Sequence, residues 1–525
     1  MKVLLIGGGG RESAIAIEIL NSQLRMLFAL KNYANKAGGL VTPENIKNAI
    51  ETLENFLSQP QFLTCREQYY HDYAKFFEGV GEGVLVGYLK TSYVVSDLYC
   101  ALSNTQIASI CKTADISLDN NSIVNFCKTN GINLVIIGPE EPLANGLADD
   151  LIAEGIKVFG PSKLASQIES SKIFMKNFCT QYNIPTAKYE TFYSDKHSKQ
   201  QIIDFAKQIS QGGLPIVLKT NGLAAGKGVA ICSSIAEFEL ELDDYFNGKF
   251  GSASQSIVVE QFMQGSEVSF FALCDGTHFK TLPYACDHKK LLDGNKGPNT
   301  GGMGTFSHKA ILNNQQIAEV EANIIAPLVK GMFAENHPYK GVIFAGLMIT
   351  NNGIKLIEYN ARLGDPETQC ILPLIKNNFL QIVFGAIEGV NGFDIELENS
   401  ACVNVVCVAG GYPDKYNKGD EIIIKTKTFQ NAIITNKSHL ENISEKQLTA
   451  WQIIKNDIKN LFNPRQFLPQ IIHCGVATNG KKLTTNGGRV ISVRAKASTM
   501  HEARSNVYRS LKSIKFTGMF YRKDI

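Results

Sequence analysis

The chain has 525 residues, enough for about three or four domains that each bury a core. Hydrophobic residues make up 44% and charged residues 19%, as in ordinary soluble proteins, and a net charge of +3 argues against nucleic acid or a membrane surface as the main partner. Twelve cysteines without a C-x-x-C pair, and no apolar stretch expected to serve as a signal peptide or membrane span, predict a cytoplasmic protein with reduced thiols.

The first 160 residues are predicted to form an open α/β domain with a parallel sheet. The unbroken apolar run at residues 3–6 predicts a buried strand, which four glycines connect to a helix at about 11–20. Residues 133–137 repeat this pattern of strand and glycine-bearing turn, so ligands are expected at the carboxyl ends of these strands. Between them, residues 22–96 are predicted to be a mostly helical structural insert with its own small core.

The glycine run after the first strand predicts an anion site. Its sequence, G-G-G-G-R-E-S, contains the first two glycines of a dinucleotide-binding loop, but Glu12 stands where the third belongs. Backbone amides at the start of a helix attract anions, and Arg11 adds a positive charge. We therefore expect one phosphate of a small substrate here rather than a dinucleotide. A purely structural tight turn is the alternative.

A second glycine-rich loop, at residues 219–229, is predicted to cover a triphosphate and reads K-T-N-G-L-A-A-G-K-G-V. Lys219 ends a strand, and Gly226 and Gly228 flank a second lysine, Lys227. The amides and lysines of a loop without bulky side chains suit a highly charged anion. It is not a Walker loop, because Gly228 occupies the position of the required Ser or Thr. A mobile surface loop is the alternative.

Two further segments in the middle of the chain are candidates for ligand contacts. Residues 258–267 read as a strand running into an exposed linker, which suits an adenine edge, with Glu267 placed for ribose hydroxyls. A plain strand and turn is the alternative. Residues 287–304 hold five glycines, and loops of this length inside a compact domain are usually functional. His288 is either a substrate contact or a lone surface histidine.

The segment at residues 357–368 carries the most chemistry and reads I-E-Y-N-A-R-L-G-D-P-E-T. An N-N-G turn signal predicts a β-hairpin over residues 342–360. Because side chains alternate faces along a strand, Glu358, Asn360 and, if the strand continues, Arg362 are expected to point the same way. Two oxygen ligands and a guanidinium suit a magnesium-bound phosphate. Three polar residues at a solvated strand end are the alternative.

Residues 396–525 are predicted to form a β-rich domain. A strand is expected at 403–408, followed by turn signals at Gly410-Gly411 and 486–488. A second insert, at about 427–469, contains the only tryptophan, Trp451, and is interpreted as structural.

These elements, in this order, resemble the glycinamide ribonucleotide synthetase (phosphoribosylamine–glycine ligase) family of the ATP-grasp superfamily, over nearly the whole chain outside the two inserts. The resemblance implies an N-terminal α/β substrate-binding domain (1–160), a central ATP-grasp domain pair (161–395) with a lid at about 186–262, and a C-terminal β-rich domain (396–525). The segments that carry it are G-G-R-E at 9–12, G-P-E-x-P-L at 138–143, the loop at 222–229, G-P-N-T-G-G-M-G at 297–304, E-x-N-x-R-x-G-D-P-E-T at 358–368, T-N-G-G-R-V at 485–490 and the closing R-K-D-I.

Enzymes of this family join glycine to 5-phosphoribosylamine with ATP in purine synthesis, through a glycyl phosphate. The resemblance implies ATP with Mg²⁺ or Mn²⁺, and Glu358 and Asn360 as metal ligands; we expect a monomer. Arg362 and Lys227 are the expected catalytic residues, because phosphoryl transfer depends on positioning and charge neutralisation. The implied ATP-binding residues are Lys172, Lys219, Gly226, Lys227, Gly228, Glu260, Gln261, Phe262, Met263 and Glu267. The implied substrate-binding residues are Gly10, Arg11, Glu12, Asn104, Glu140, Asp287, His288, Asn299, Thr300, Gly301, Gly302, Met303, Arg362, Asp365 and Pro366.

Three positions depart from the family pattern. Ser13 stands where G-G-R-E-H has histidine, Asn104 is what remains of a P-G-N segment, and Asn221 replaces an acidic residue of the second glycine-rich loop. The first two touch the implied phosphoribosylamine pocket. They leave open an ATP-grasp ligase with a different amine acceptor. A second alternative is a non-catalytic ATP-binding or assembly protein, in which the two inserts form a partner surface.

Overall fold

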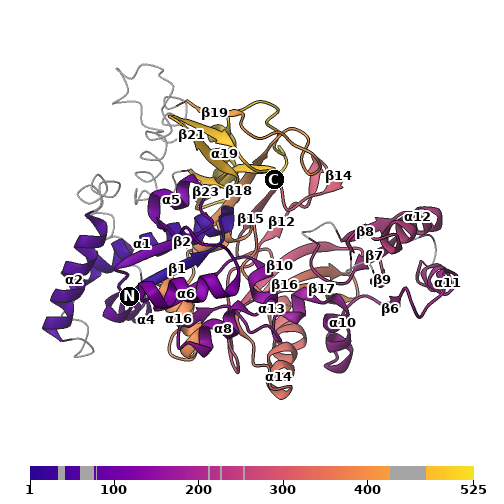
Figure 1. Ribbon diagram of the computed structural model, residues 1–525, viewed down its shortest axis with the longest axis horizontal. Helices are drawn as coiled ribbons and strands as arrows, with labels where there is room; N and C mark the ends of the chain where they lie inside the picture. The colour runs from indigo at the N-terminus through magenta and orange to yellow at the C-terminus, as the bar shows by residue number, and fades with distance from the viewer. Residues whose placement is uncertain are drawn as a thin grey trace.

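The computed structural model describes residues 1–33, 42–58, 76–77, 80–210, 213, 215–224, 228–251, 255–425 and 469–525. The predicted mixed α/β multidomain fold is confirmed, with a parallel sheet near the N-terminus and β-rich sheets near the C-terminus. Figure 1 shows the C-terminal part above the centre of the molecule and a small unit with α11 and α12 at one side. Three residues named above, Gly226, Lys227 and Trp451, lie outside the described residues.

The first sheet is parallel and has the strand order β3-β2-β1-β4-β5. β1 lies at its centre and pairs with both β2 and β4. Every residue of β4 is buried, as an unbroken apolar sequence in a parallel sheet requires. The elements of this part are β1 (Lys2–Ile6), α1 (Gly10–Tyr33), α2 (Pro43–Leu57), α4 (Glu82–Leu89), η3 (Thr91–Tyr93), β2 (Asp97–Ala101), α5 (Thr105–Ile110), β3 (Lys112–Thr113), α6 (Asn120–Asn130), β4 (Leu134–Ile137), α7 (Glu140–Ala144), α8 (Leu147–Ala153) and β5 (Lys157–Phe159).

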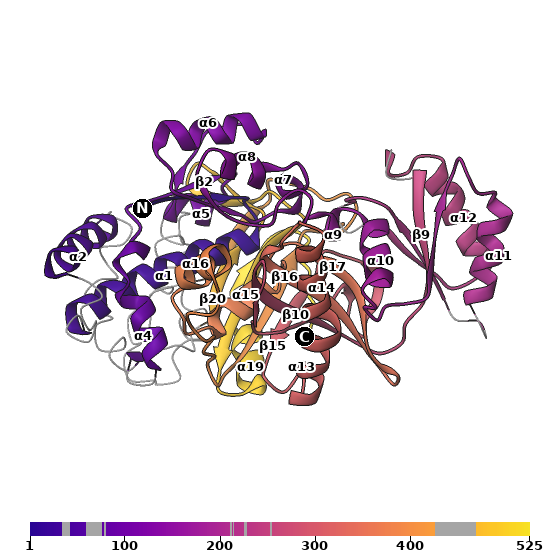
Figure 2. The ribbon, with the colours of Figure 1, turned by 90° about the horizontal axis from the view of Figure 1, so that it is seen from below.

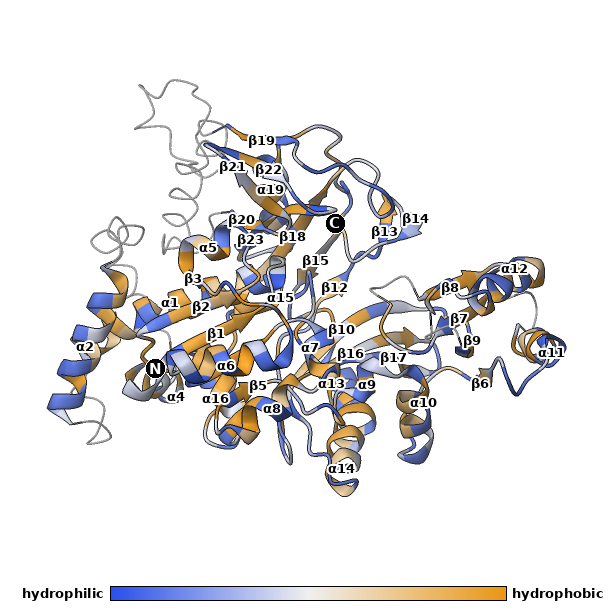
Figure 3. Cartoon of the chain, viewed as in Figure 1, coloured by the Kyte–Doolittle hydropathy of each residue, from blue (hydrophilic) through white to orange (hydrophobic). Residues whose placement is uncertain are grey.

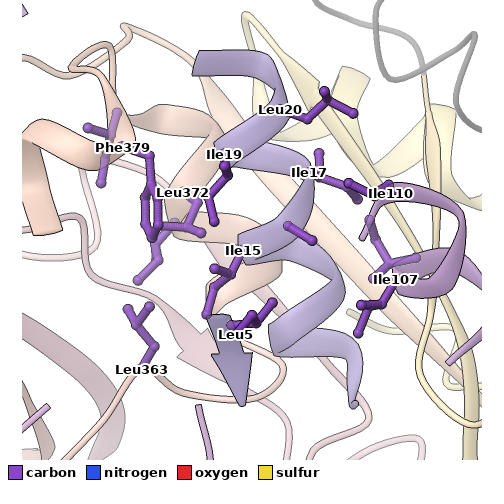
Figure 4. Close-up of a cluster of buried hydrophobic side chains, with 14 of the residues drawn as sticks. Leu5, Ile15, Ile17, Ile19, Leu20, Ile107, Ile110, Leu363, Leu372 and Phe379 are labelled. Atoms are coloured by element: carbon purple, nitrogen blue, oxygen red, sulfur yellow. The ribbon is translucent and has the colours of Figure 1, made fainter. Parts of the chain in front are cut away.

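Helix α1 extends well beyond the end that the sequence pattern predicted near residue 20. Figure 4 shows Ile15 directed towards Leu363 and Ile17 directed towards α5 on the opposite side of the helix. Among the described helices α1 is the one that is long and apolar enough to cross a membrane, contrary to our expectation of none. However, 89% of its most apolar window is buried inside the protein, as in the core helix of a globular domain.

The described part of the first insert does not form a core of its own, contrary to the prediction. Leu53, Phe77 and Tyr88 belong to the same hydrophobic cluster as residues of β1 and of α16 (Phe379–Glu388). The Tyr88 hydroxyl also donates a hydrogen bond to the Lys376 carbonyl at 3.0 Å. The described part of the insert therefore enlarges the main core, because α2 and α4 pack on the extended helix α1.

The central part contains two antiparallel sheets, a lid sheet with the order β6-β9-β7-β8 and a body sheet with the order β11-β10-β16-β17. The predicted hairpin is confirmed as β16–β17, and Gly353 in its turn has a φ of +96°. Figure 2 shows the lid helices α11 and α12 together at one end of the molecule, away from the parallel sheet. The elements are α9 (Gln167–Ser170), α10 (Lys172–Gln181), β6 (Tyr189–Tyr193), α11 (Lys199–Ile209), β7 (Ile216–Thr220), β8 (Val229–Cys232), α12 (Ile235–Phe246), β9 (Ser256–Gln261), β10 (Ser266–Asp275), β11 (Phe279–Thr281), β12 (Cys286–Asp287), β13 (Lys290–Leu292), β14 (Lys296–Asn299), β15 (Gly304–Ser307), α13 (Asn314–Val320), η5 (Glu321–Ile325), α14 (Ala326–Ala334), β16 (Lys340–Thr350), β17 (Gly353–Asn360), α15 (Thr368–Ile371), η6 (Leu372–Leu374) and α16.

The C-terminal sheet includes two strands from the central part of the chain. Its order is β12-β15-β18-β23-β20, so β12 and β15 extend a sheet whose other strands come from the last 125 residues. Figure 3 shows hydrophobic colouring along β18, all of whose residues are buried, and alternating colours along α2. The elements of this part are β18 (Ala401–Val408), β19 (Glu421–Ile424), β20 (Gln470–His473), β21 (Val476–Asn479), β22 (Lys482–Thr485), β23 (Arg489–Ala497), α19 (Met500–Leu511) and β24 (Ile514–Lys515).

Candidate functional site

Two neighbouring cavities lie where the lid sheet, the body sheet and the segment at 287–304 meet. The larger cavity has a volume of about 610 Å³ and the smaller one about 200 Å³. Glu358 and Lys289 line both, together with Asp287 and Thr300. A ligand that fills both cavities would therefore pass beside Glu358.

The larger cavity collects most of the residues predicted to bind ATP. The strand β9 and the linker that follows it contribute four consecutive residues, and β7 contributes Lys219 from the adjacent strand. The cavity is also lined by part of the glycine-rich segment. The predicted residues found here are Lys219, Glu260, Gln261, Phe262, Met263, Glu267, Asp287, His288, Asn299, Thr300 and Glu358.

A buried charge cluster lies at the root of the lid. Glu260 Oε1 is 3.0 Å from Lys219 Nζ and 3.2 Å from Lys176 Nζ, and all three side chains are almost fully buried. Lys176 Nζ also donates to the Thr186 hydroxyl at 2.7 Å, which in turn donates to the Leu356 carbonyl at 2.8 Å. Burial, opposed by Glu260, lowers the pKa of Lys176 to about 8. This cluster joins α10, the lid strands and β17.

Lys176 was not among the residues predicted from the sequence. It lies four residues after Lys172 on α10, a spacing that puts both side chains on one face of a helix. That spacing was the available signal. Lys172 itself lines the smaller cavity, and its Nζ donates to the Gly222 carbonyl at 2.9 Å.

The smaller cavity is lined by Glu358, Asn360 and Arg362. Alternation accounts for the first two, because β17 ends at Asn360 and Arg362 lies beyond the strand. Burial would raise the pKa of Glu358, but Lys289, Lys219 and other cations outweigh it and lower the pKa below its usual value. The Glu358 carboxylate is therefore ionised at neutral pH and offers anionic oxygens to a cation. The described residues contain no group of three or more His, Cys, Asp or Glu side chains suited to a metal. A carboxylate plus the Asn360 amide fits Mg²⁺, which takes one or two protein oxygens and leaves the rest to phosphate and water.

Arg362 is held between two carboxylates. Its Nε lies 3.2 Å from Glu140 Oε2, and one of its terminal nitrogens lies 3.0 Å from Glu169 Oε1. Glu169 Oε2 accepts the Ala361 amide at 2.7 Å, so one carboxylate fixes both the backbone after Asn360 and the guanidinium. Burial raises the pKa of Glu169, although the Arg362 charge opposes it. The sequence analysis missed Glu169, which lies just before the Ser171-Lys172 pair.

The second glycine-rich loop is described only at its ends. Gly228 lines the smaller cavity, and a Cβ there would lie 2.5 Å from the Thr220 methyl group, so the position has room only for glycine. Asn221 accepts the Ile173 amide at 3.3 Å and the Ser171 hydroxyl at 3.1 Å. The amide that replaces the acidic residue of the family thus links the loop to the start of α10.

The segment at 287–304 contributes charged side chains to both cavities. Lys289 Nζ pairs with Glu267 Oε2 at 3.1 Å. Burial and the neighbouring Glu367 carboxylate raise the pKa of Asp287 well above its usual value. Burial and the nearby Arg522 charge lower the pKa of His288, so its imidazole is neutral at pH 7. The predicted contact residue Met303 instead packs fully buried in the main core and lines neither cavity.

Asp365 and Pro366 are held by Arg489 of β23. The peptide bond between Asp365 and Pro366 is cis, and Asp365 Oδ2 lies 3.1 Å from the Arg489 guanidinium. Arg489 also donates to the carbonyls of Gly301 and Asp365, at 2.6 and 2.8 Å. Asp365 and Gly301 line the smaller cavity. Gly302 and Pro366 do not line it, and they lie so close together that a Cβ at Gly302 would be 2.4 Å from Pro366 Cδ.

The first glycine loop is built around the carboxylate of Glu12. Glu12 accepts the Gly9 amide at 2.7 Å and pairs with Arg11 at 2.6 Å. A Cβ at Gly138 would lie 2.1 Å from Glu12 Oε1. This contact explains why a glycine also follows β4. Gly10, Arg11 and Glu12 line neither of the two cavities, and Arg11 donates to the Leu363 carbonyl at 3.1 Å.

The two departures Ser13 and Asn104 meet in the structure. The Asn104 amide nitrogen lies 2.8 Å from the Ser13 hydroxyl and also donates to the carbonyls of Gly8 and His473, at 3.0 and 2.9 Å. Its carbonyl oxygen caps the N-terminus of α5. Both side chains are buried, and neither lines the two cavities. Asn104 thus joins the first glycine loop to the C-terminal sheet through β20.

Comparisons with known proteins match the N-terminal, central and C-terminal parts of the chain to the same family. Three models of the phosphoribosylglycinamide synthetase family match it: the N domain at residues 78–169, the ATP-grasp (A) domain at 170–368 and the C domain at 453–525. A phosphoribosylamine–glycine ligase from Brucella melitensis is 38% identical over 449 residues, covering 85% of this chain and 95% of that protein. The corresponding protein from Caldanaerobacter subterraneus is 36% identical over 450 residues, covering 85% and 97%.

Solved structures show the same fold. The crystal structure of phosphoribosylamine–glycine ligase from Thermotoga maritima superposes with a TM-score of 0.67 at 25% identity, covering 100% of both chains. The biotin carboxylase domain of 2-oxoglutarate carboxylase from Hydrogenobacter thermophilus, in complex with MgADP, ADP and bicarbonate, gives a TM-score of 0.59 at 13% identity, covering 99% of this chain and 91% of that one. At that identity the second similarity concerns the fold alone.

Proposed function

This chain belongs to the phosphoribosylglycinamide synthetase family of ATP-grasp ligases, and from that premise we propose how its own residues carry out the reaction. The protein is a phosphoribosylamine–glycine ligase of purine biosynthesis. We assign ATP to the two cavities, with the nucleoside in the larger one and the phosphates towards Glu358. The observation that carries this assignment is the position of Glu358 at the junction of both cavities.

The nucleotide would be held mainly by the lid. The backbone of residues 260–263 is proposed to meet the adenine, and Glu267 the ribose. Lys172 and Lys219 would neutralise the triphosphate from two sides, because both charges act on Glu358 at the cavity junction. Gly226, Lys227 and Gly228 are proposed to cover the phosphates, and for the first two this stays a sequence prediction.

Glu358 and Asn360 are the proposed ligands of a divalent cation, for which Mg²⁺ is the best match to an oxygen-only donor set. Such a cation would supply positive charge that neutralises the phosphates during the transfer. Arg362 would bind the γ-phosphoryl group while the glycine carboxylate attacks its phosphorus, which forms glycyl phosphate and releases ADP. The amine of phosphoribosylamine then displaces phosphate and gives glycinamide ribonucleotide. Glu140 and Glu169 keep the guanidinium oriented for this step.

The proposed substrate contacts lie on the side of the smaller cavity. Glu140, Asp365, Thr300 and Gly301 line that side and are proposed to contact glycine or phosphoribosylamine. Gly10, Arg11, Glu12 and Asn104 are proposed to serve the phosphoribosylamine phosphate, although their hydrogen bonds are made within the protein. The monomeric state and the cytoplasmic location remain predictions.

Release of ADP tests the assignment. Purified protein supplied with ATP, Mg²⁺, glycine and freshly generated phosphoribosylamine should release ADP and form glycinamide ribonucleotide. Omission of phosphoribosylamine, or its replacement by another primary amine, provides the matched controls. Turnover no higher than in these controls would contradict the proposed substrate pair, whereas turnover with the other amine alone would reassign the acceptor.

A further inference from the structure

The hairpin β13–β14 forms one wall of the larger cavity but belongs to no larger sheet. Its two strands pair only with each other, across a register irregularity between Lys290 and Leu292. Residues 292–298 are exposed, while Lys290, Asn295 and Asn299 line the cavity. A two-stranded hairpin is marginally stable on its own. Something else in the protein must hold this wall in place.

The segment Arg522-Lys523-Asp524 makes that contact. One terminal nitrogen of Arg522 donates to the Lys290 carbonyl and to the Asn295 side chain, both at 3.0 Å. The Lys523 amide donates to Asp293 Oδ1 at 2.8 Å, and Asp524 Oδ2 accepts the Gly294 amide at 2.8 Å. These four hydrogen bonds reach both ends of the hairpin turn.

The segment is itself rigidly held. Arg522 is 1% exposed, and its remaining nitrogens bind both oxygens of Asp524 at 2.8 and 2.7 Å. The Tyr508 hydroxyl of α19 donates to the Arg522 carbonyl at 2.9 Å and accepts the Ile525 amide at 3.1 Å. When two nitrogens of a planar guanidinium group pair with a carboxylate, its remaining N–H donors point in a fixed direction. The hairpin is therefore docked on the C-terminal part through one oriented guanidinium.

We propose that Arg522 and Asp524 are positioning residues, which dock the β13–β14 hairpin so that it completes the wall of the larger cavity. This explains the R-K-D-I sequence, whose residues touch neither cavity. Identification of the bound molecule as ATP rests on the proposed function, whereas docking of the hairpin does not.

Hydrogen exchange tests the docking directly. Arg522→Ala removes two of the four hydrogen bonds and should accelerate exchange of the hairpin amides about tenfold. Two bonds of about 1 kcal/mol each contribute about 2 kcal/mol, and a tenfold change needs a net loss of about 1.4 kcal/mol. Amides of β16 in the same sample serve as the internal reference. Since Arg522 is buried and its loss can impair folding, Asp293→Ala offers a second route. Asp293 is exposed and lines neither cavity. Its substitution removes the hydrogen bond from the Lys523 amide and so weakens the docking from the hairpin side.

Lys523→Ala is the matched control, because Lys523 contacts the hairpin only through its backbone amide. Kinetics separate positioning from general stability: Arg522→Ala and Asp293→Ala should raise the KM for ATP about threefold or more and leave kcat within about twofold. Unchanged hairpin exchange in both variants would overturn the proposal. Faster exchange without a change in KM would also overturn it, because the hairpin would then not be part of the binding wall. If the wild-type protein released no ADP, the proposed function would fail while the exchange data still decided the docking.

Discussion

The buried cluster of Lys176, Glu260 and Lys219 gives a prediction that depends on the sign of a pKa shift. The pKa of Lys176 falls from 10.5 to about 8, because burial and the neighbouring Lys219 outweigh the attraction of Glu260. Between these two values the unfolded chain binds more protons than the folded protein, so the folded state gains stability as the pH rises. Below about pH 8 this contribution is absent.

Lys176→Met removes the titrating group and keeps most of its volume. At about pH 7 Lys176 is protonated in both the folded and the unfolded state. The pKa shift then causes almost no pH-dependent change in the free energy of unfolding of the wild type relative to the variant. At about pH 9.5 the folded lysine is neutral while the unfolded one is still mostly charged, which favours the wild type by about 2 kcal/mol. The stability of wild type relative to Lys176→Met should therefore increase by about 2 kcal/mol between the two pH values.

Urea unfolding of both proteins at the two pH values measures this difference, since titrating groups outside the cluster of Lys176, Glu260 and Lys219 cancel between them. The control is Lys199→Met on the same lid, because Lys199 pairs with Asp243 at the surface and is 44% exposed. That variant should show no such pH dependence. A difference between Lys176→Met and wild type that stays constant from about pH 7 to pH 9.5 would refute the reasoning, because Lys176 would then remain charged beside Glu260.

Three further predictions concern the site and one strained residue. Glu358→Gln should lower the rate of ADP release about 100-fold or more and weaken its dependence on Mg²⁺, because an anionic metal ligand is lost; a rate near wild type would exclude Glu358 as a ligand. Glu169→Ala should lower kcat about 100-fold through misplacement of Arg362, and Glu169→Gln less, since the glutamine oxygen can still accept the Ala361 amide. Equal effects of the two variants, measured in the same assay, would contradict that order. Leu102→Gly should raise the free energy of unfolding by about 0.5–1 kcal/mol, because Leu102 has a φ of +64° and is 53% exposed; a lower melting temperature would show that its exposed side chain stabilises the fold.

Local patterns predicted the parts of the protein that depend on a few neighbouring residues. The strands β1 and β4 follow from unbroken apolar runs, and β18 follows from an apolar run that only Asn404 interrupts. The β16–β17 hairpin follows from its N-N-G turn. Alternation along β17 was enough to put Glu358 and Asn360 in one cavity, whereas Arg362 lies beyond the end of this strand. These features need only the geometry of a single strand or turn.

Other features arise from packing between distant segments. The first insert shares the main core because α1 continues past its predicted end, and an apolar pattern does not say which surface it will cover. β12 and β15 join the C-terminal sheet, since strand pairing is decided by the whole arrangement of the chain.

The sequence by itself determined the family, the order of the elements and the side chains that we propose to meet a metal-bound phosphate. Only the tertiary structure decided what holds those side chains in place. Glu169 orients Arg362 across 193 positions of the chain, and Arg522 docks a hairpin that lies 232 positions away at Lys290. Such contacts leave no local pattern in the sequence, because folding brings a buried charge and its partner together from distant segments. In the protein interior the low polarity makes the paired interaction strong and an unpaired charge costly.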